Sequence, residues 1–147
     1  IHFFNPAHIM QLVEIIPGIA TNMNLTKHVA KLIHSWGKIT VIAKDTPGFI
    51  VNRLARSFYG EAIRIYEEGI AGFETIDQVM KQKGGFKMGP FKLMDLIGND
   101  INLAVTQSLY DAFNHEHRFL PSALQINKVK EGKLGRKTGE GFYNYNK

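Results

Sequence analysis

The chain has 147 residues, of which 44% are hydrophobic and 11% aromatic. A chain of this length usually forms one domain, and this composition can bury a core, which excludes an intrinsically disordered protein. The absence of cysteine excludes disulfides and thiolate metal sites. No run approaches about 18 apolar residues, so the sequence predicts no membrane-spanning helix. The first residues include neither an initiator Met nor a secretion signal, which favours a fragment of a longer protein.

The formal net charge of +5 is concentrated at one end of the chain. Residues 128–147 hold six Lys and Arg against two Asp and Glu, whereas residues 47–127 hold eight against nine. A nucleic-acid-binding face would interleave basic and aromatic residues over a larger surface. The charge pattern alone leaves two interpretations open for this basic tail: a solvated end or a contact for an anionic ligand. Its members are Lys128, Lys130, Lys133, Arg136 and Lys137.

The first 45 residues have the pattern of an α/β sheet. Residues 12–16 and 39–43 are rich in β-branched side chains and bounded by Gly or Pro, which predicts two strands. Apolar residues recur at helical spacing over residues 24–36, and Gly37 follows as a C-cap, which predicts a helix between the strands. A strand, a helix and a strand in this order predict parallel pairing. The opening residues 1–4 are interpreted as one more strand, ended by a turn at Asn5-Pro6.

After residue 45 the pattern becomes helical. Pro47 predicts a helix start and Gly69 its end, and Thr75 with Gln78 matches a capping box for a short helix that reaches Lys83. Residues 90–113 predict one long helix with a single apolar stripe, and residues 122–130 predict the last helix. Long helices with broad apolar faces usually pair with a partner, so we expect a helical dimerisation domain over residues 46–147.

Several common motifs are missing from the sequence. It contains no G-x-G-x-x-G turn, no Walker-type loop and no H-E-x-x-H zinc motif. The segment His115-Glu116-His117 is a weak metal candidate, because two histidines spaced by two on a helix point to different sides and no third ligand is evident. We therefore predict no metal site.

The strongest candidates for chemistry are His2 and Glu14. Histidine titrates near neutral pH and is the usual general acid or base, and it needs a partner that fixes its tautomer. Glu14 is the only acid in the first 44 residues and lies within an apolar run, where an unpaired carboxylate would be costly. A strand at 1–4, a turn and a strand from residue 12 would bring the two together. The spacing alone also allows a structural histidine and a partly exposed glutamate, and Asn52 is equally open as a ligand donor or a plain helix residue.

Five separated blocks of the sequence, in order, resemble the L-3-hydroxyacyl-CoA dehydrogenase family. The match extends over essentially the whole chain and is far more specific than any single motif. The blocks are H-F-F-N-P at residues 2–6, M-x-L-V-E-I-I at 10–16, K-D-T-P-G-F-I-V-N-R at 44–53, G-P-F-x-L-x-D-x-I-G at 89–98 and G-R-K-T-G-E-G-F-Y at 135–143.

The resemblance implies a fold and a division of the chain. Residues 1–45 would be the last βαβ strands of a Rossmann-type NAD-binding domain, and residues 46–147 a mostly α, 6-phosphogluconate dehydrogenase C-terminal-like domain for substrate binding and dimerisation. It also implies that the glycine-rich half of the NAD site is absent, so we expect this chain to be inactive alone. The parent would act in the bacterial cytoplasm or the mitochondrial matrix.

The resemblance further implies NAD-dependent interconversion of (S)-3-hydroxyacyl-CoA and 3-oxoacyl-CoA, as in fatty-acid β-oxidation, butanoate or phenylacetate pathways. His2 would take the proton of the C3 hydroxyl, Glu14 would pair with it, and Asn52 would hold the substrate. Asn5 and Lys137 would contact the cofactor. Two alternatives are a non-catalytic dimerisation module and another hydroxyacid dehydrogenase of the same superfamily; the H-F-F-N-P block argues against the latter.

Overall fold

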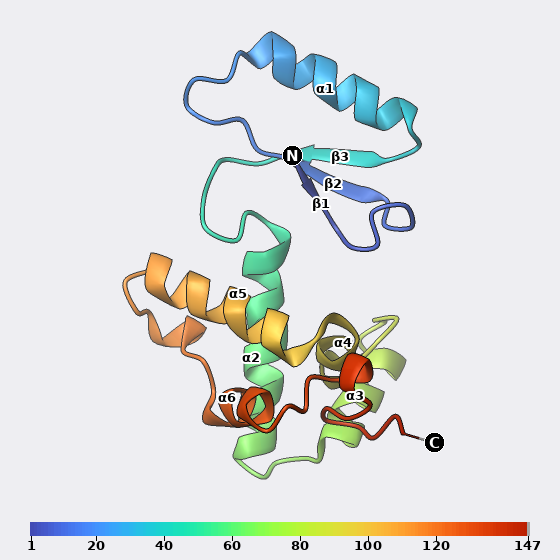
Figure 1. The fold of residues 1–147 in the computed structure, drawn as a ribbon, viewed down its shortest axis with the longest axis vertical. Helices are drawn as coiled ribbons and strands as arrows, with labels where there is room; N and C mark the ends of the chain where they lie inside the picture. Colours follow the sequence, from blue (N-terminus) through green and yellow to red (C-terminus); the bar gives the residue numbers. More distant parts are fainter. Residues whose placement is uncertain (147) are drawn as a thin grey trace. The chain divides into compact units, whose positions relative to one another are not determined.

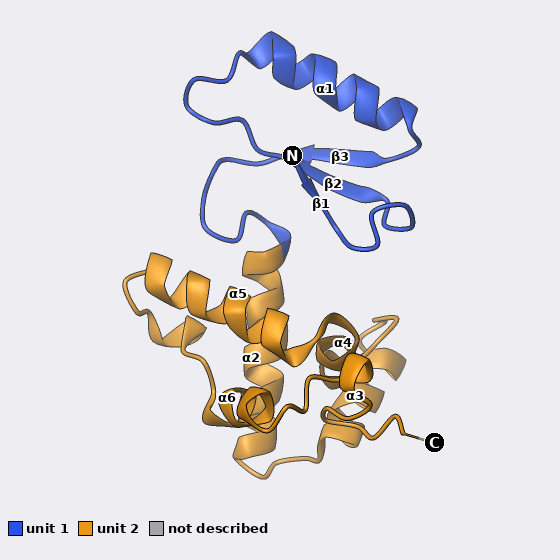
Figure 2. Ribbon diagram, viewed as in Figure 1, with its two compact units in different colours: residues 1–51 blue, residues 52–147 orange. Residues whose placement is uncertain are grey.

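The structure, a computed structural model, describes residues 1–146. The chain divides into two compact units, Ile1–Val51 and Asn52–Lys147, and each is described separately below (Figure 2). Within the described residues the model contains six α-helices and three short strands. The expected fold class, a mostly α chain that begins with the strands of an α/β sheet, is confirmed.

Unit 1 is a small three-stranded sheet with one helix (Figure 1). Its strands are β1 (His2–Phe3), β2 (Leu12–Ile15) and β3 (Ile39–Ile42), and α1 (Met23–Ser35) connects β2 to β3. The strand order is β1-β2-β3; β1 pairs with β2 antiparallel, and β3 pairs with β2 parallel. The predicted parallel strand–helix–strand unit is therefore confirmed.

The core of unit 1 follows from strand alternation. Successive side chains of a strand point to opposite faces of the sheet. Val13 and Ile15 on β2 are buried with Ile33 of α1, so this face of the sheet is the one that the helix covers. Glu14 lies between them in sequence and therefore points to the opposite face. It is completely buried there, which requires that polar partners surround its carboxylate.

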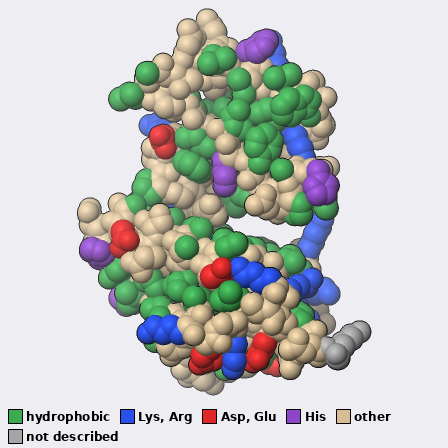
Figure 3. All heavy atoms as spheres, in the orientation of Figure 1, with side chains coloured by type: hydrophobic (Ala, Val, Ile, Leu, Met, Phe, Trp, Pro, Cys, Tyr) green, Lys and Arg blue, Asp and Glu red, His purple; other side chains and the backbone are tan. Residues whose placement is uncertain are grey.

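Unit 1 leaves much apolar surface uncovered. Figure 3 shows hydrophobic side chains gathered on the visible face of the unit drawn at the top. Surfaces of this kind typically pack against other protein. The large hydrophobic residues that are at least 46% exposed on β3, on α1 with its C-cap and on the loop before α1 are Ile19, Met23, Leu25, Leu32, Trp36, Ile39 and Ile42.

Unit 2 is a helical domain. Helix α2 (Val51–Glu67) leads into it, followed by α3 (Phe73–Gln82), α4 (Pro90–Ile97), α5 (Asn99–Ala112) and α6 (Ala123–Lys130), with 3-10 turns at η1 (His117–Phe119) and η2 (Arg136–Thr138). Its core contains residues of α2, α3 and α4 together with Phe142 from the C-terminal segment. The rings of Phe91 and Phe142 lie 4.8 Å apart, so the end of the chain is part of this core.

The helix predicted from Pro47 starts later than expected. Residues 47–50 form a turn, and α2 begins at Val51. Gly48 and Phe49 have φ values of 74° and 45°, which lie in the left-handed region and cannot belong to a right-handed helix. The proline thus begins a tight turn that precedes the helix. The two compact units meet between Val51 and Asn52. The division into functional domains at residue 45 stays a prediction.

Two other helix predictions were wrong. Residues 90–113 form two helices, because Gly98 has a φ of 106° and separates α4 from α5. Helix α3 starts at Phe73 with Gly72 as its N-cap, so Thr75 lies inside the helix and forms no capping box. The last helix begins as predicted, with the Ser122 hydroxyl accepting from the Leu124 amide.

The predicted apolar stripe of residues 90–113 is only partly buried. Leu109 is in the core, but Ile97 and Ile101 are exposed, while Asn99 and Asn102 are buried. On this helix pair, polar side chains thus contribute much of the inward face. None of the helices within residues 1–146 is long and apolar enough to cross a membrane.

Candidate active site

His2 and Glu14 lie side by side in unit 1. They are register partners on the antiparallel strands β1 and β2, and directly opposite residues of such a pair point to the same face. The His2 Nδ1 atom lies 2.8 Å from Glu14 Oε2. The spacing argument thus anticipated a contact that the structure contains, and a two-stranded register produces it.

The partners of Glu14 determine which nitrogen of His2 carries a proton. Glu14 Oε1 accepts the main-chain N–H groups of Ile50 and Val51, both at 3.0 Å. Both amides are donors, so this oxygen is an acceptor, which is the role of a carboxylate oxygen. An ionised carboxylate can only accept, so His2 Nδ1 must donate to it. The lone pair of the neutral ring is then on Nε2, which leaves that atom to take up a proton.

Two aromatic rings flank the imidazole of His2. The ring centroids of Phe4 and Phe49 lie 4.6 Å and 5.5 Å from it. Phe4 directly follows β1, two residues after His2, whereas Phe49 comes from the turn before α2. The His2 side chain remains 29% exposed, so it is reachable from outside unit 1. Sequence reasoning missed Phe49; the Gly48 that precedes it was the available signal for a special turn.

Asn5 lies in the loop that connects β1 to β2. Asn5 is exposed and follows His2 by three positions. The loop is fastened to the rest of unit 1 by Lys38, whose Nζ donates to the carbonyl oxygens of Ala7 at 2.6 Å and Met10 at 2.8 Å. Lys38 was not among the predicted site residues. It gives the exposed loop two fixed points next to the candidate histidine.

Asn52 is the second residue of α2 and the first of unit 2. It is covalently next to Val51, whose amide binds Glu14. The main-chain oxygen of Asn52 accepts from Arg56 Nε at 3.2 Å. Its side chain is half-buried and has no hydrogen bond to any described residue, so the amide group is available for a ligand.

Arg56 anchors the first turns of α2 within unit 2. It is 5% exposed, and its Nη1 donates to the Asn102 carbonyl at 2.9 Å and to Thr106 Oγ1 at 2.8 Å. Gln125 of α6 also donates to Asn102, at 2.6 Å. Burial lowers the pKa of the Arg56 guanidinium to about 10. The network therefore joins α2, α5 and α6 around one buried cation, and the sequence pattern had not indicated it.

Two family models match the chain. One, described as 3-hydroxyacyl-CoA dehydrogenase, C-terminal domain, matches residues 48–145. The other, described as 3-hydroxyacyl-CoA dehydrogenase, NAD binding domain, matches residues 1–46. The chain belongs to the 3-hydroxyacyl-CoA dehydrogenase family. The resemblance stated from the five sequence blocks is thereby confirmed.

Individual relatives of this chain are longer than it is. The chain is 50% identical over 145 residues to 3-hydroxyadipyl-CoA dehydrogenase of Escherichia coli (strain K12), covering 99% of this chain and 30% of that protein. It is 45% identical over 147 residues to the mitochondrial hydroxyacyl-coenzyme A dehydrogenase of Homo sapiens, covering 99% and 46%. Among solved structures, 3-hydroxybutyryl-CoA dehydrogenase from E. coli K12 matches with a TM-score of 0.94 and 50% identity, covering 98% of this chain and 30% of that one. The chain thus spans about a third to a half of these relatives.

The other predicted cofactor residue, Lys137, lies on η2 in unit 2. Its Nζ donates to Asp100 Oδ2 at 2.7 Å. The hydrogen bond from Lys137 holds the pKa of the Asp100 carboxyl below its usual value. Lys137 and Asn5 belong to different units, and the structure does not place them together. Within unit 2, Lys137 helps to fasten η2 to the start of α5.

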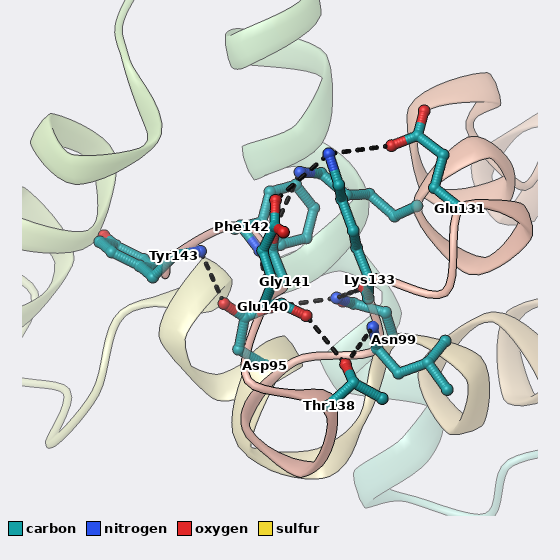
Figure 4. Close-up of polar contacts among 11 residues, drawn as sticks. Asp95, Asn99, Glu131, Lys133, Thr138, Glu140, Gly141, Phe142 and Tyr143 are labelled. Atoms are coloured by element: carbon teal, nitrogen blue, oxygen red, sulfur yellow. Dashed lines mark hydrogen bonds and ion pairs between the residues drawn. The ribbon is translucent and has the colours of Figure 1, made fainter. Parts of the chain in front are cut away.

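Much of the basic tail is engaged within unit 2. Lys133 forms ion pairs with Glu131 and Glu140, both at 3.2 Å, and the side chains converge in Figure 4. Lys128 donates to the Gly141 carbonyl at 2.8 Å. Internal contacts of this kind favour the structural interpretation for these two lysines over an anion-binding one.

The C-terminal segment is held by a buried acid, Asp95 of α4. Its Oδ1 and Oδ2 accept the amides of Phe142 and Tyr143, both at 2.9 Å (Figure 4). Its Oδ2 also accepts the Tyr145 hydroxyl at 3.1 Å. A Cβ added to Gly141 would lie 2.0 Å from Asp95 Oδ1. The glycine is therefore required because the backbone passes directly over the carboxylate.

The His115-Glu116-His117 segment does not form a helix as the metal argument assumed. His115 follows α5 with a φ of 62°, and η1 starts at His117. The His115 ring packs at a tilt against Tyr110, with the centroids 4.7 Å apart, and its Nε2 lies 3.6 Å from Asp111 Oδ1. Among residues 1–146, no group of three or more metal-ligating side chains converges.

Proposed function

We propose that the chain is the part of an NAD-dependent (S)-3-hydroxyacyl-CoA dehydrogenase that carries the catalytic His–Glu pair. The observation that supports this most directly is the 2.8 Å contact between His2 Nδ1 and Glu14 Oε2 in a chain of this family. Oxidation of a secondary alcohol needs a base for its O–H proton as well as a hydride acceptor. A histidine whose tautomer is fixed by a buried carboxylate supplies that base.

His2 is the proposed general acid and base. In the oxidative direction its Nε2 takes the proton of the C3 hydroxyl while the C3–H bond breaks. In the reductive direction the imidazolium returns that proton to the oxygen at C3. Glu14 acts through His2: it orients the ring and stabilises the imidazolium that forms. Because Glu14 is itself held by two main-chain amides, the ring and the carboxylate stay aligned throughout the cycle.

NAD, when bound, supplies the carbon that accepts or gives up the hydride. The side chains of this chain that are proposed to bind NAD would contact only part of the cofactor. The exposed side-chain amide of Asn5 can both donate to and accept from a carboxamide, and Lys137 offers a cation. No glycine-rich pyrophosphate turn is present in the 147 residues, so we expect the chain alone not to bind NAD productively.

Asn52 is the proposed substrate contact, because its half-buried side-chain amide has no hydrogen bond to any described residue and the Arg56 network fixes its helix turn. The substrate is an acyl-CoA thioester. The whole enzyme is proposed to be a homodimer in the cytoplasm or the mitochondrial matrix. Two exposed apolar side chains of unit 2, Leu54 on α2 at 69% and Ile101 on α5 at 50%, suit a dimer contact.

The test uses a chimera. The part of the E. coli 3-hydroxyadipyl-CoA dehydrogenase that precedes its aligned region is fused in front of Ile1. NADH consumption is then measured with acetoacetyl-CoA, beside the 147-residue chain alone. We expect turnover by the chimera and none by the chain alone. We expect His2→Ala in the chimera to lower kcat by at least about 100-fold, since general acid–base catalysis contributes that much or more.

The matched control is His28→Ala, which removes an exposed histidine of α1 in the same unit. It should leave kcat unchanged. A His2→Ala chimera as active as the wild type would contradict the proposal. Turnover by the chain alone that disappears with His2→Ala would support the chemistry and overturn the expected inactivity of the chain.

A further inference from the structure

One short segment, residues 48–51, contacts both members of the His–Glu pair. Phe49 packs its ring 5.5 Å from that of His2. The next two residues, Ile50 and Val51, donate their amides to Glu14 Oε1 at 3.0 Å. A ring contact on one partner and two hydrogen bonds on the other thus come from consecutive residues, all within unit 1.

The backbone of this segment is held in an unusual conformation. Phe49 has a φ of 45°, in the left-handed region that bulky residues avoid. Its amide donates to the Thr46 carbonyl at 2.9 Å, which closes the turn. A bulky residue keeps such a conformation only where its surroundings fix it, and such positions concentrate at functional sites. If only the turn mattered, a residue such as glycine would adopt this conformation with less strain. The presence of phenylalanine therefore indicates that its ring has a role at this position.

Resting on the proposed function, we propose that Phe49 is a positioning residue for His2. The left-handed turn directs the aromatic ring onto the imidazole and presents the Ile50 and Val51 amides to Glu14. Glu14 fixes the imidazole at Nδ1 through one hydrogen bond, about which the ring can still tilt and swing. Contact with Phe49 restricts this motion and keeps Nε2 directed toward the substrate. Phe4 follows His2 by only two residues in the chain, whereas Phe49 comes from a separate segment and contacts the imidazole independently of β1.

The first test observes His2 directly and needs no cofactor. In the 147-residue chain with 15N-labelled histidine, NMR follows the exchange of the Nδ1 proton that is hydrogen-bonded to Glu14. Phe49→Leu keeps an apolar side chain but removes the ring. We expect it to speed this exchange by about tenfold, because the hydrogen bond between His2 and Glu14 opens more often when the ring contact is lost. The matched control is Phe3→Leu, which removes the exposed phenylalanine next to His2 on the same strand.

A second variant separates the ring from the backbone. Glycine adopts positive φ without strain, so Phe49→Gly preserves the turn and removes the ring. We expect this variant to retain the thermal stability of unit 1 and still to speed the Nδ1 exchange. If exchange is as slow in both Phe49 variants as in the wild type, the inference is wrong.

The third readout is kinetic and uses the chimera described above. Phe49→Leu should lower kcat by about tenfold while the KM for NADH stays within twofold, because misplaced catalytic groups slow the chemical step. A fall in kcat that Phe3→Leu reproduces would contradict the inference. If His2→Ala leaves turnover intact, the proposed function fails. If His2→Ala abolishes turnover but Phe49→Leu changes neither kcat nor the exchange, only the role of Phe49 fails.

Discussion

The two units each contain a buried acid with nearly the same main-chain partners. Glu14 in unit 1 accepts the amides of two consecutive residues at 3.0 Å, and Asp95 in unit 2 does the same at 2.9 Å. Both acids are at most 1% exposed. They differ in their side-chain partners: Glu14 meets His2, whereas Asp95 accepts from the Tyr145 hydroxyl and from the Asn99 side-chain amide.

That side-chain partner determines what each acid can do. The imidazole of His2 has a second ring nitrogen that can take up and return a proton, and its side chain is partly exposed. The hydroxyl of Tyr145 cannot, because burial and then the negative charge of Asp95 raise its pKa to about 12. Asp77 of α3 resembles Asp95, because it accepts the amides of Phe91 and Lys92 and the hydroxyl of Tyr143. Burial and the contact with Asp77 also raise the pKa of the Tyr143 hydroxyl. The same main-chain arrangement therefore surrounds the proposed catalytic pair in unit 1 and structural contacts in unit 2.

The largest effect that distinguishes the two acids is expected from Glu14→Gln. The glutamine oxygen can still accept the Ile50 and Val51 amides, but its NH2 group cannot accept the proton of His2 Nδ1. In the chimera we expect kcat to fall by about 100-fold, with little change in NADH affinity, because the imidazolium loses its stabilising charge. Steady-state kinetics and NADH titration measure the two quantities. Unchanged turnover in a folded variant would show that the pair has no catalytic role.

Asp95→Asn should change stability and leave the chemistry intact. The asparagine NH2 would face donors, the Tyr143 amide or the Tyr145 hydroxyl, and a buried donor would lose its acceptor. We expect a loss of about 2 kcal/mol in the free energy of unfolding, read from urea denaturation. The folded fraction should keep its kcat. A lowered kcat in the fully folded variant would contradict a purely structural role for Asp95.

The smallest effect concerns alkaline pH. Because the pKa of Tyr145 is raised to about 12, the native state keeps this proton in the range where an unfolded tyrosine, of pKa near 10, loses it. The stabilisation is thus complete below pH 10 and declines as the pH rises toward 12. We expect the melting temperature to fall over that range, and Tyr145→Phe to make the fall shallower. Tyr110→Phe is the control, since no hydrogen bond joins its hydroxyl to a carboxylate within residues 1–146; an equal effect of both variants would contradict the assignment.

Local pattern alone was sufficient for much of the fold. The β-branched strands, the helix between them and the last helix are short-range features, and the structure contains them close to where they were predicted. The same applies to the approach of His2 and Glu14, because a two-stranded register converts sequence spacing directly into contact. The sequence therefore determined these elements and the identity of the candidate pair.

Other features depended on contacts between distant residues. The turn at 47–50 could not be distinguished from a helix start, because its left-handed residues are fixed by packing near His2 and Glu14. The break at Gly98 was hidden by a continuous apolar stripe, of which Ile97 and Ile101 are in fact exposed.

The partners of the buried polar groups are the clearest example. Arg56 reaches residues about 50 positions away, and Asp95 reaches Phe142 and Tyr143, 47 and 48 positions away. A buried ionised group must find partners wherever the chain brings them, and no local periodicity records where that is. The sequence thus determined which residues could carry a proton. Only the tertiary structure decided which buried acid meets a histidine and which meets a tyrosine.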